Sequence, residues 1–177
     1  MLQTIYAQPV VWMIVEVLCI PILWNRFSAL RSKRSWVNLL AQSALLILSL
    51  YMIVYTTLLA RAPSSSRLTD YRMPFALVRA AVSENREIFR SLFLNVLLFE
   101  PLGAALVHLL PGKQPRWGRI LTATLIGLAL SLAIEYCQIR FSVGNAEADD
   151  VICNTLGALV GALSCLFPKR NTGAKNA

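Results

Sequence analysis

The chain has 177 residues, of which 56% are hydrophobic and only 15% are charged, and its formal net charge is +8. Its mean hydropathy of +0.58 lies well above that of soluble proteins and is typical of chains that cross a membrane several times. The Lys and Arg residues form short clusters between apolar segments, a distribution that determines membrane topology and argues against a nucleic-acid partner.

Five apolar segments follow one another, each near the ~20 residues needed to cross a hydrocarbon core. In chain order they are Ile5–Trp24, Trp36–Leu59, Ser91–Leu110, Ile120–Ile139 and Val151–Phe167. The N-terminus lacks the basic region of a signal peptide, so we expect the first segment to be retained as a helix. The sequence therefore predicts an all-α protein, a polytopic integral membrane bundle with one transmembrane helix for each of these five segments.

The charges of the connections predict how this bundle is oriented. The connections at 25–35 and 111–119 and the tail at 169–177 are basic and contain no acid, whereas 140–150 contains three acids. Because basic connections face the cytoplasm, we expect the N-terminus outside and the C-terminus inside. An odd number of helices is required for that arrangement, in agreement with the five apolar segments.

This topology divides the chain into three parts. Residues 1–60 would hold the first two helices, 61–168 an external loop with helices three to five, and 169–177 a basic cytoplasmic tail. The connection at 60–90 is long and carries six Arg residues against three acids. Its patchy apolar content indicates a part that lies on the membrane or dips into it.

Polar residues of four separate segments are expected to meet at the outer end of the bundle. They come from the external loop, the start of the third helix, the end of the fourth and the start of the fifth. The polar residues expected there are Arg72, Arg79, Asn95, Glu135, Gln138, Asp149, Asp150 and Asn154. Ionisable groups at membrane depth are costly and usually mark a functional site or an internal pair, so the convergence predicts an outer polar pocket.

Structural roles for the same residues stay open. Asp149 or Asp150 could cap the fifth helix, and Asn154 could form a hydrogen bond between helices. Glu135 requires a cationic partner, because Gln138 cannot neutralise its charge. The candidates for that partner are Arg72, Arg79 and Arg140.

Several residues indicate helix packing rather than chemistry. Gly157 and Gly161 form a GxxxG motif, which permits close contact between helices, and Gly103 is a further small residue. Pro101 removes a backbone hydrogen bond and is expected to kink the third helix.

Metal centres and cofactors have little support in this sequence. The cysteines lie in or beside apolar segments without metal-binding spacing, although a disulfide between Cys137 and Cys153 stays open. His108 is the single histidine, which argues against a His-based metal centre and against a Ser-His-Asp triad. We therefore expect no cofactor and no resident metal.

Four motifs, in this order and spacing, resemble the VanZ-like family across about residues 70–165. They are Arg72-Met73-Pro74-Phe75, the run from Asn95 to Gly103, Glu135-Tyr136-Cys137-Gln138, and the run from Asp149 to Gly157 with Gly161. The resemblance implies a multi-pass protein of the bacterial cytoplasmic membrane, in a family whose named member is associated with resistance to the glycopeptide antibiotic teicoplanin. That family usually has an Arg shortly before the acidic pair, where this chain has Gly144-Asn145.

Three functional hypotheses follow. The first is a non-enzymatic cell-envelope protein that binds a lipid-linked glycan or a lipoglycopeptide through Arg72, Asn95, Glu135, Gln138, Asp150 and Asn154. The second is a membrane enzyme acting on lipid-phosphate intermediates, with Glu135 and Asp149 or Asp150 as an acid–base pair or as Mg²⁺ ligands. The third is a lipid flippase or transporter, acting as a homodimer through a small-residue face, with Glu16, Glu100 and Glu135 as steps across the bilayer.

Overall fold

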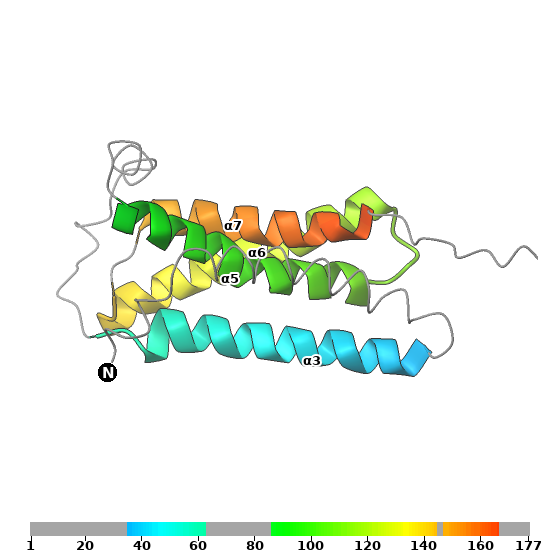
Figure 1. The fold of residues 1–177 in the computed structure, drawn as a ribbon, viewed down its shortest axis with the longest axis horizontal. Helices are drawn as coiled ribbons and strands as arrows, with labels where there is room; N and C mark the ends of the chain where they lie inside the picture. The colour runs from blue at the N-terminus through cyan, green and yellow to red at the C-terminus, as the bar shows by residue number, and fades with distance from the viewer. Residues whose placement is uncertain (1–34, 63–85, 145–146, 167–177) are drawn as a thin grey trace, which may run out of the picture.

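The computed structural model of the chain describes residues 35–62, 86–144 and 147–166 (Figure 1). Its elements in chain order are α3 Ser35–Val54, the π-helix η2 Tyr55–Leu59, α5 Arg86–Leu109, α6 Arg116–Phe141, α7 Ala148–Leu163 and the 3₁₀ helix η4 Ser164–Leu166. The predicted first segment, Ile5–Trp24, lies outside the described residues, and so do the candidate residues Arg72 and Arg79.

Four of the described helical stretches are long and apolar enough to cross a membrane. They are Leu39–Leu59, Ser91–Leu109, Arg116–Phe141 and Ala148–Leu166. The all-helical prediction is confirmed for the described part of the chain, where each of these stretches matches one predicted apolar segment. The total number of crossings and the direction of insertion stay predictions.

The start of α7 differs from the one that the apolar pattern predicts. The pattern placed the start at Val151, whereas the helix begins at Ala148 with Glu147 as its N-cap residue. Asp149 and Asp150 therefore lie within the first turn, and neither occupies the cap position. Carboxylates are favourable in a first turn because the free N–H groups and the helix dipole give that end a partial positive charge.

The helices form a bundle in which neighbours along the chain run in opposite directions (Figure 1). The helix α7 packs most extensively on α5 and also packs on α6, while α3 packs on α5. We call the end at which η2 and α6 finish and α5 and α7 begin the polar end. It is drawn at the left in Figure 1.

The close approach of α5 and α7 depends on small residues. A Cβ atom on Gly157 would collide with the backbone carbonyl of Val96, and one on Gly161 with that of Glu100. In the same way, a Cβ on Gly103 would collide with the carbonyl of Ala158. The small-residue face of α7 is thus used inside this chain, against α5, and is not free to form a dimer interface.

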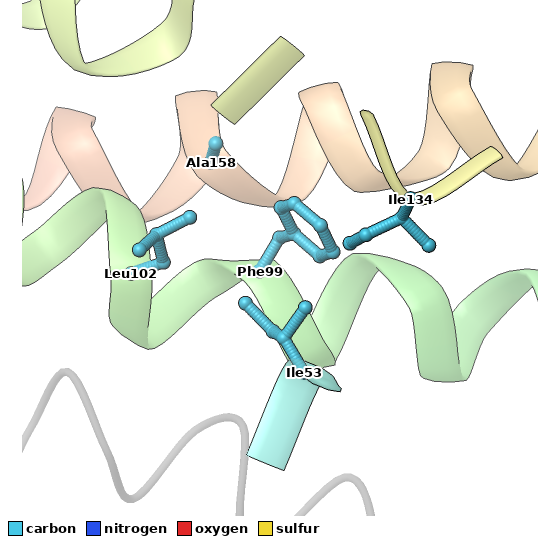
Figure 2. Packing of buried hydrophobic residues seen from close by; sticks show 5 residues of the cluster. All are labelled: Ile53, Phe99, Leu102, Ile134 and Ala158. Carbon is cyan, nitrogen blue, oxygen red and sulfur yellow. The ribbon is translucent and has the colours of Figure 1, made fainter. Parts of the chain in front are cut away.

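Apolar side chains fill the space between the helices. The central cluster consists of Ile53, Phe99, Leu102, Ile134 and Ala158, one or two residues from each of the four long helices (Figure 2). Each is at most 4% exposed. Because α3 contributes Ile53 to this cluster, it belongs to the same packed unit as α5, α6 and α7.

The outward faces of α3 and α6 are apolar as well. Only 17% of the apolar stretch Leu39–Leu59, in α3 and η2, is buried within the protein, compared with 50% for Ser91–Leu109 and for Ala148–Leu166. Large exposed side chains on the two outer helices include Leu40, Ile47, Leu48, Leu121 and Leu125. An apolar surface of this extent is costly in water and favourable in lipid, which agrees with a membrane location.

Candidate functional site

Asp150 lies at the centre of a hydrogen-bonded network at the polar end. The Nδ2 atom of Asn95 donates a hydrogen bond of 2.6 Å to its Oδ1, and a terminal nitrogen of Arg61 lies 3.9 Å from its Oδ2. The Asp150 side chain is 9% exposed and that of Arg61 30% exposed. A buried carboxylate requires such partners to offset its lost hydration. One carboxyl group thus connects α7, α5 and the segment that follows η2.

Glu135 attaches α6 to the beginning of α7. Its Oε2 accepts a hydrogen bond of 2.9 Å from the backbone N–H of Glu147, the N-cap residue of α7. Electrostatic interactions also connect its carboxyl group with Asp150, Glu147 and Arg61. Arg61 forms its ion pair with Asp150, and its charge also acts on Glu135 without a direct contact.

Gln138 connects α6 to the π-helix η2. Its Nε2 donates a hydrogen bond of 3.0 Å to the backbone carbonyl of Thr57, and both residues are buried. In η2, Ala60 N–H bonds to the carbonyl of Tyr55, five residues back, a wider turn that π-helices adopt and that is frequent at functional sites. The Gln138 amide thus donates a hydrogen bond to a carbonyl near the helix end, where the carbonyls have no N–H donor within the helix.

Asn154 forms the deepest polar contact of the group. Its Nδ2 donates a hydrogen bond of 2.9 Å to the hydroxyl oxygen of Ser131, in the buried contact between α7 and α6. Ser131 lies one turn before Glu135 on α6, and Asn154 lies one turn after Asp150 on α7. Polar contacts between α6 and α7 therefore extend from the level of Glu135 and Asp150 one turn toward the middle of the bundle.

Arg61 was missed as a site residue by the sequence analysis, which considered other arginines as the cation. It packs on Gly144, where a Cβ atom would lie 2.5 Å from the Arg61 Cδ. Gly144 has a φ of 63°, a left-handed conformation that glycine adopts readily, and its N–H donates to the carbonyl of Ala62 at 3.2 Å. The absence of a side chain at 144 gives the guanidinium its place beside Asp150. The sequence signal that could have indicated Arg61 was a glycine shortly before the acidic pair.

The remaining candidates are placed as follows. Asp149 is buried in the first turn of α7, with 2% exposure. Arg140 is exposed in the last turn of α6, and Arg61 is the cation that acts on both carboxyl groups within the part of the chain that the structure describes. We call the polar side chains that make these separate contacts the polar cluster: Arg61, Asn95, Ser131, Glu135, Gln138, Asp150 and Asn154.

Two amide side chains of the polar cluster each leave one buried polar atom without a partner. The Oε1 of Gln138 and the Oδ1 of Asn154 are buried without a hydrogen-bond partner. For Gln138 the assignment of the two amide atoms is fixed by chemistry, because the carbonyl of Thr57 can only accept. An unpartnered buried polar atom costs about 1–3 kcal/mol and is uncommon in folded proteins.

The described residues were compared with the metal and disulfide expectations from the sequence. Within the described residues, no group of three or more His, Cys, Asp or Glu side chains could hold a metal ion. Cys137 and Cys153 are both free thiols, so the disulfide left open by the sequence is not formed.

Comparison with known proteins adds one match. The family model VanZ/LLP1 matches residues 43–168, which include most of α3, η2 and Arg61 in addition to the motifs described above. No curated protein matches this chain, and no solved structure does.

Proposed function

The chain belongs to the VanZ/LLP1 family of membrane proteins, and from that premise we propose that it binds a cell-envelope ligand at the polar end. The ligand class is a lipid-linked glycan or a lipophilic glycopeptide. The protein would act in the bacterial cytoplasmic membrane, as a multi-pass binder rather than as an enzyme. The residues expected to contact the ligand are Asn95, Glu135, Gln138, Asp150 and Asn154, with Arg61 in place of the Arg72 that the sequence suggested.

One observation carries this proposal. Seven polar side chains, from α5, α6, α7 and the segment that follows η2, lie at the same end of an otherwise apolar bundle, and two of their amide oxygens are buried without a partner. Packing alone would favour apolar side chains at these positions, because buried polar groups cost free energy unless they are paired. A glycan offers many hydroxyl and amide donors to such acceptors, and a lipid tail would lie along the apolar faces of the helices.

The orientation that the charge pattern predicts agrees with an envelope ligand. The connection at 111–119, at the end opposite the polar cluster, carries three basic residues and no acid. By the positive-inside rule this end faces the cytoplasm, so the polar cluster faces outward. Labelling of single cysteines introduced at Lys113 and Ser142 with a membrane-impermeant maleimide in intact cells tests this orientation. Labelling at 142 alone agrees with it, and labelling at 113 alone reverses it.

Resistance to teicoplanin is the proposed cellular outcome, and it can be tested directly. The growth-inhibitory concentration of teicoplanin is measured for a susceptible Gram-positive host that expresses the wild type, Glu135→Gln or Glu100→Gln at equal membrane abundance. Glu100 is a matched control, because it is 3% exposed on α5 and makes no hydrogen bond to the cluster. A rise with the wild type and Glu100→Gln, but not with Glu135→Gln, supports the proposal. No rise with the wild type contradicts a role in resistance.

Catalysis is the second candidate, since one observation favours it. The carboxyl groups of Glu135 and Asp150 interact electrostatically in a buried setting, as acid–base pairs do. Both groups also have structural partners, Glu147 N–H for Glu135 and Asn95 for Asp150, which is the reason that binding is preferred. Incubation of the purified protein with an undecaprenyl pyrophosphate substrate and Mg²⁺ separates the two functions. Time-dependent release of phosphate would establish an enzyme, and an unchanged ligand agrees with a binder.

A further inference from the structure

Exposed aromatic residues mark two levels on the outward faces of α3 and α6. Both helices begin at the end opposite the polar end, and α6 and η2, which continues α3, finish at the polar end (Figure 1). Trp36 and Trp117 lie near the two starts and are 58% and 67% exposed. Tyr55 and Tyr136 lie toward the polar end and are 45% and 67% exposed. We call the first pair the tryptophan level and the second pair the tyrosine level.

The two levels are separated by the same length of helix on both faces. Tyr55 follows Trp36 by 19 positions, and Tyr136 follows Trp117 by 19 positions. In an α-helix this spacing corresponds to about 28 Å, close to the ~30 Å hydrocarbon core of a typical bilayer. Trp and Tyr are enriched where hydrocarbon meets head groups, because their rings are apolar and carry one polar group. The agreement between two separate helices indicates that both levels follow a membrane boundary.

Charged residues on α6 respect the same limits. Between the two levels, the side chains that the structure shows as exposed on α3 and α6 are apolar or aromatic, with large ones such as Ile47 and Leu125 among them. On α6, exposed Arg116 directly precedes Trp117, and exposed Arg140 follows Tyr136 by one turn. A cation near the end of a membrane helix can reach the head groups, whereas one within the hydrocarbon is costly. The apolar interval on α6 therefore ends where its aromatic residues lie.

We propose that lipid acyl chains cover the outward faces of α3 and α6, and that the hydrocarbon core of the bilayer ends at the tryptophan level on one side and at the tyrosine level on the other. The occupant of this surface is the bilayer and not a second copy of this chain, because aromatic residues at both limits match a boundary between hydrocarbon and head groups. The inference concerns the bilayer alone and does not depend on the ligand proposed above.

This placement gives the depth of the polar cluster. Glu135 directly precedes Tyr136 and so lies at the tyrosine level, and Gln138 lies beyond that level, on the head-group side. Ser131, five positions before Tyr136, lies about 7 Å inside the hydrocarbon core together with its partner Asn154. The polar cluster thus crosses the boundary. Its Glu135 carboxyl group lies at the depth of the head groups, where an ionisable group costs less than at the bilayer centre.

Nitroxide labels on single introduced cysteines test the two levels. The full-length protein, with its native cysteines replaced by alanine, is placed in dioleoyl phosphatidylcholine bilayers. Power saturation then compares collisions of each label with oxygen, which concentrates in hydrocarbon, and with a water-soluble nickel chelate. We expect the oxygen-to-nickel ratio to be highest at Ile47 and Leu125 and to fall to head-group values at Tyr55 and Tyr136. A label at Arg140 is the control on the head-group side.

Two results would overturn the proposal. A maximum of the oxygen-to-nickel ratio that lies more than one turn from Ile47 or Leu125 would contradict the levels. Few collisions with either reagent at Leu125 would show that protein covers this face, since Leu125 lies one turn from Ala129, a small exposed residue at which a second copy could pack closely.

The unsubstituted protein provides a second measurement that does not depend on the folding of any variant. Its melting temperature is determined in nanodiscs of dimyristoleoyl, dioleoyl and dierucoyl phosphatidylcholine, which differ in hydrocarbon thickness. We expect the highest melting temperature in the dioleoyl lipid, because the other two are thinner or thicker than the interval between the levels. A maximum in either of the other lipids, or no change among the three, would overturn the proposed thickness. Neither measurement uses a glycan or a glycopeptide, so a failure of the proposed function leaves this inference standing.

Discussion

The amide of Asn95 donates a hydrogen bond of 2.6 Å to the carboxylate of Asp150, so two side chains 55 positions apart in the sequence meet at the polar end. The bond joins α5, more than two turns after its start at Arg86, to the first turn of α7. Two turns further along α7, Gly157 lets the two backbones approach, because its missing Cβ leaves room for the carbonyl of Val96. Helix packing and the polar cluster thus depend on the same contact between α5 and α7.

We predict that Asn95 and Asp150 are energetically coupled. Asn95→Ala should lower the free energy of unfolding by about 1–3 kcal/mol, because it leaves a buried carboxylate without its donor. A double-mutant cycle with Asp150→Asn, measured by reversible unfolding in detergent, should give a coupling energy above about 0.5 kcal/mol. Additive effects of the two substitutions would show that the bond contributes little.

The close contact of α5 and α7 predicts a large effect from one methyl group. Gly161→Ala would place a Cβ against the backbone carbonyl of Glu100, which cannot move aside as a flexible side chain would. We expect destabilisation of about 1–3 kcal/mol and a lower yield of folded protein in detergent. Gly112→Ala is the matched control, because nothing lies within 4 Å of a Cβ at that position. Similar melting temperatures for the two variants would contradict the packing.

Gly144 and Arg61 are predicted to act together. Gly144→Ala forces a residue with a Cβ into the left-handed conformation, at a cost of about 1–2 kcal/mol, and also displaces the Arg61 side chain. Adding Arg61→Ala should therefore cost less in the Gly144→Ala background than in the wild type, as measured by thermal unfolding. Equal costs in both backgrounds would show that the guanidinium does not depend on this glycine.

Gln138 is predicted to stabilise the π-helix through its backbone contact. Gln138→Leu removes the donor to the carbonyl of Thr57 and should destabilise the protein by about 1–3 kcal/mol. Thr57→Val keeps that carbonyl and removes only the hydroxyl, whose own bond runs to the carbonyl of Ile53, so it should cost less. Amide hydrogen exchange over residues 55–62 is expected to increase in Gln138→Leu alone. Unchanged exchange there would contradict the role of this bond.

Much of the fold could be predicted from the sequence because a membrane imposes a simple rule on it. Long apolar segments must become helices, since every backbone group has to bond within its own segment, and four predicted segments are helices in the described structure. The proximity of Asn95 to Asp150 could also be predicted from the sequence. Both residues lie near the starts of predicted apolar segments, Ser91–Leu110 and Val151–Phe167, that the topology brings to the same side.

The partners of the site residues were less predictable. Ser131 is an ordinary residue in an apolar segment, and only its place one turn before Glu135 indicated a polar face. Arg61 stood at the edge of a long connection with six arginines, so charge alone could not identify it. Its role depends on the left-handed backbone at Gly144 and on the π-helix η2, two local conformations that apolar periodicity does not encode.

Direct binding of teicoplanin to the purified full-length protein tests the central claim, that the polar cluster is a ligand site. Affinity is measured in lipid nanodiscs for the wild type, for the double variant Glu135→Gln with Asn154→Ala, and for the control Glu100→Gln. The account predicts saturable binding that is retained in the control and weakened about tenfold or more in the double variant, with all three proteins folded. Equal affinity of the wild type and the double variant would contradict it.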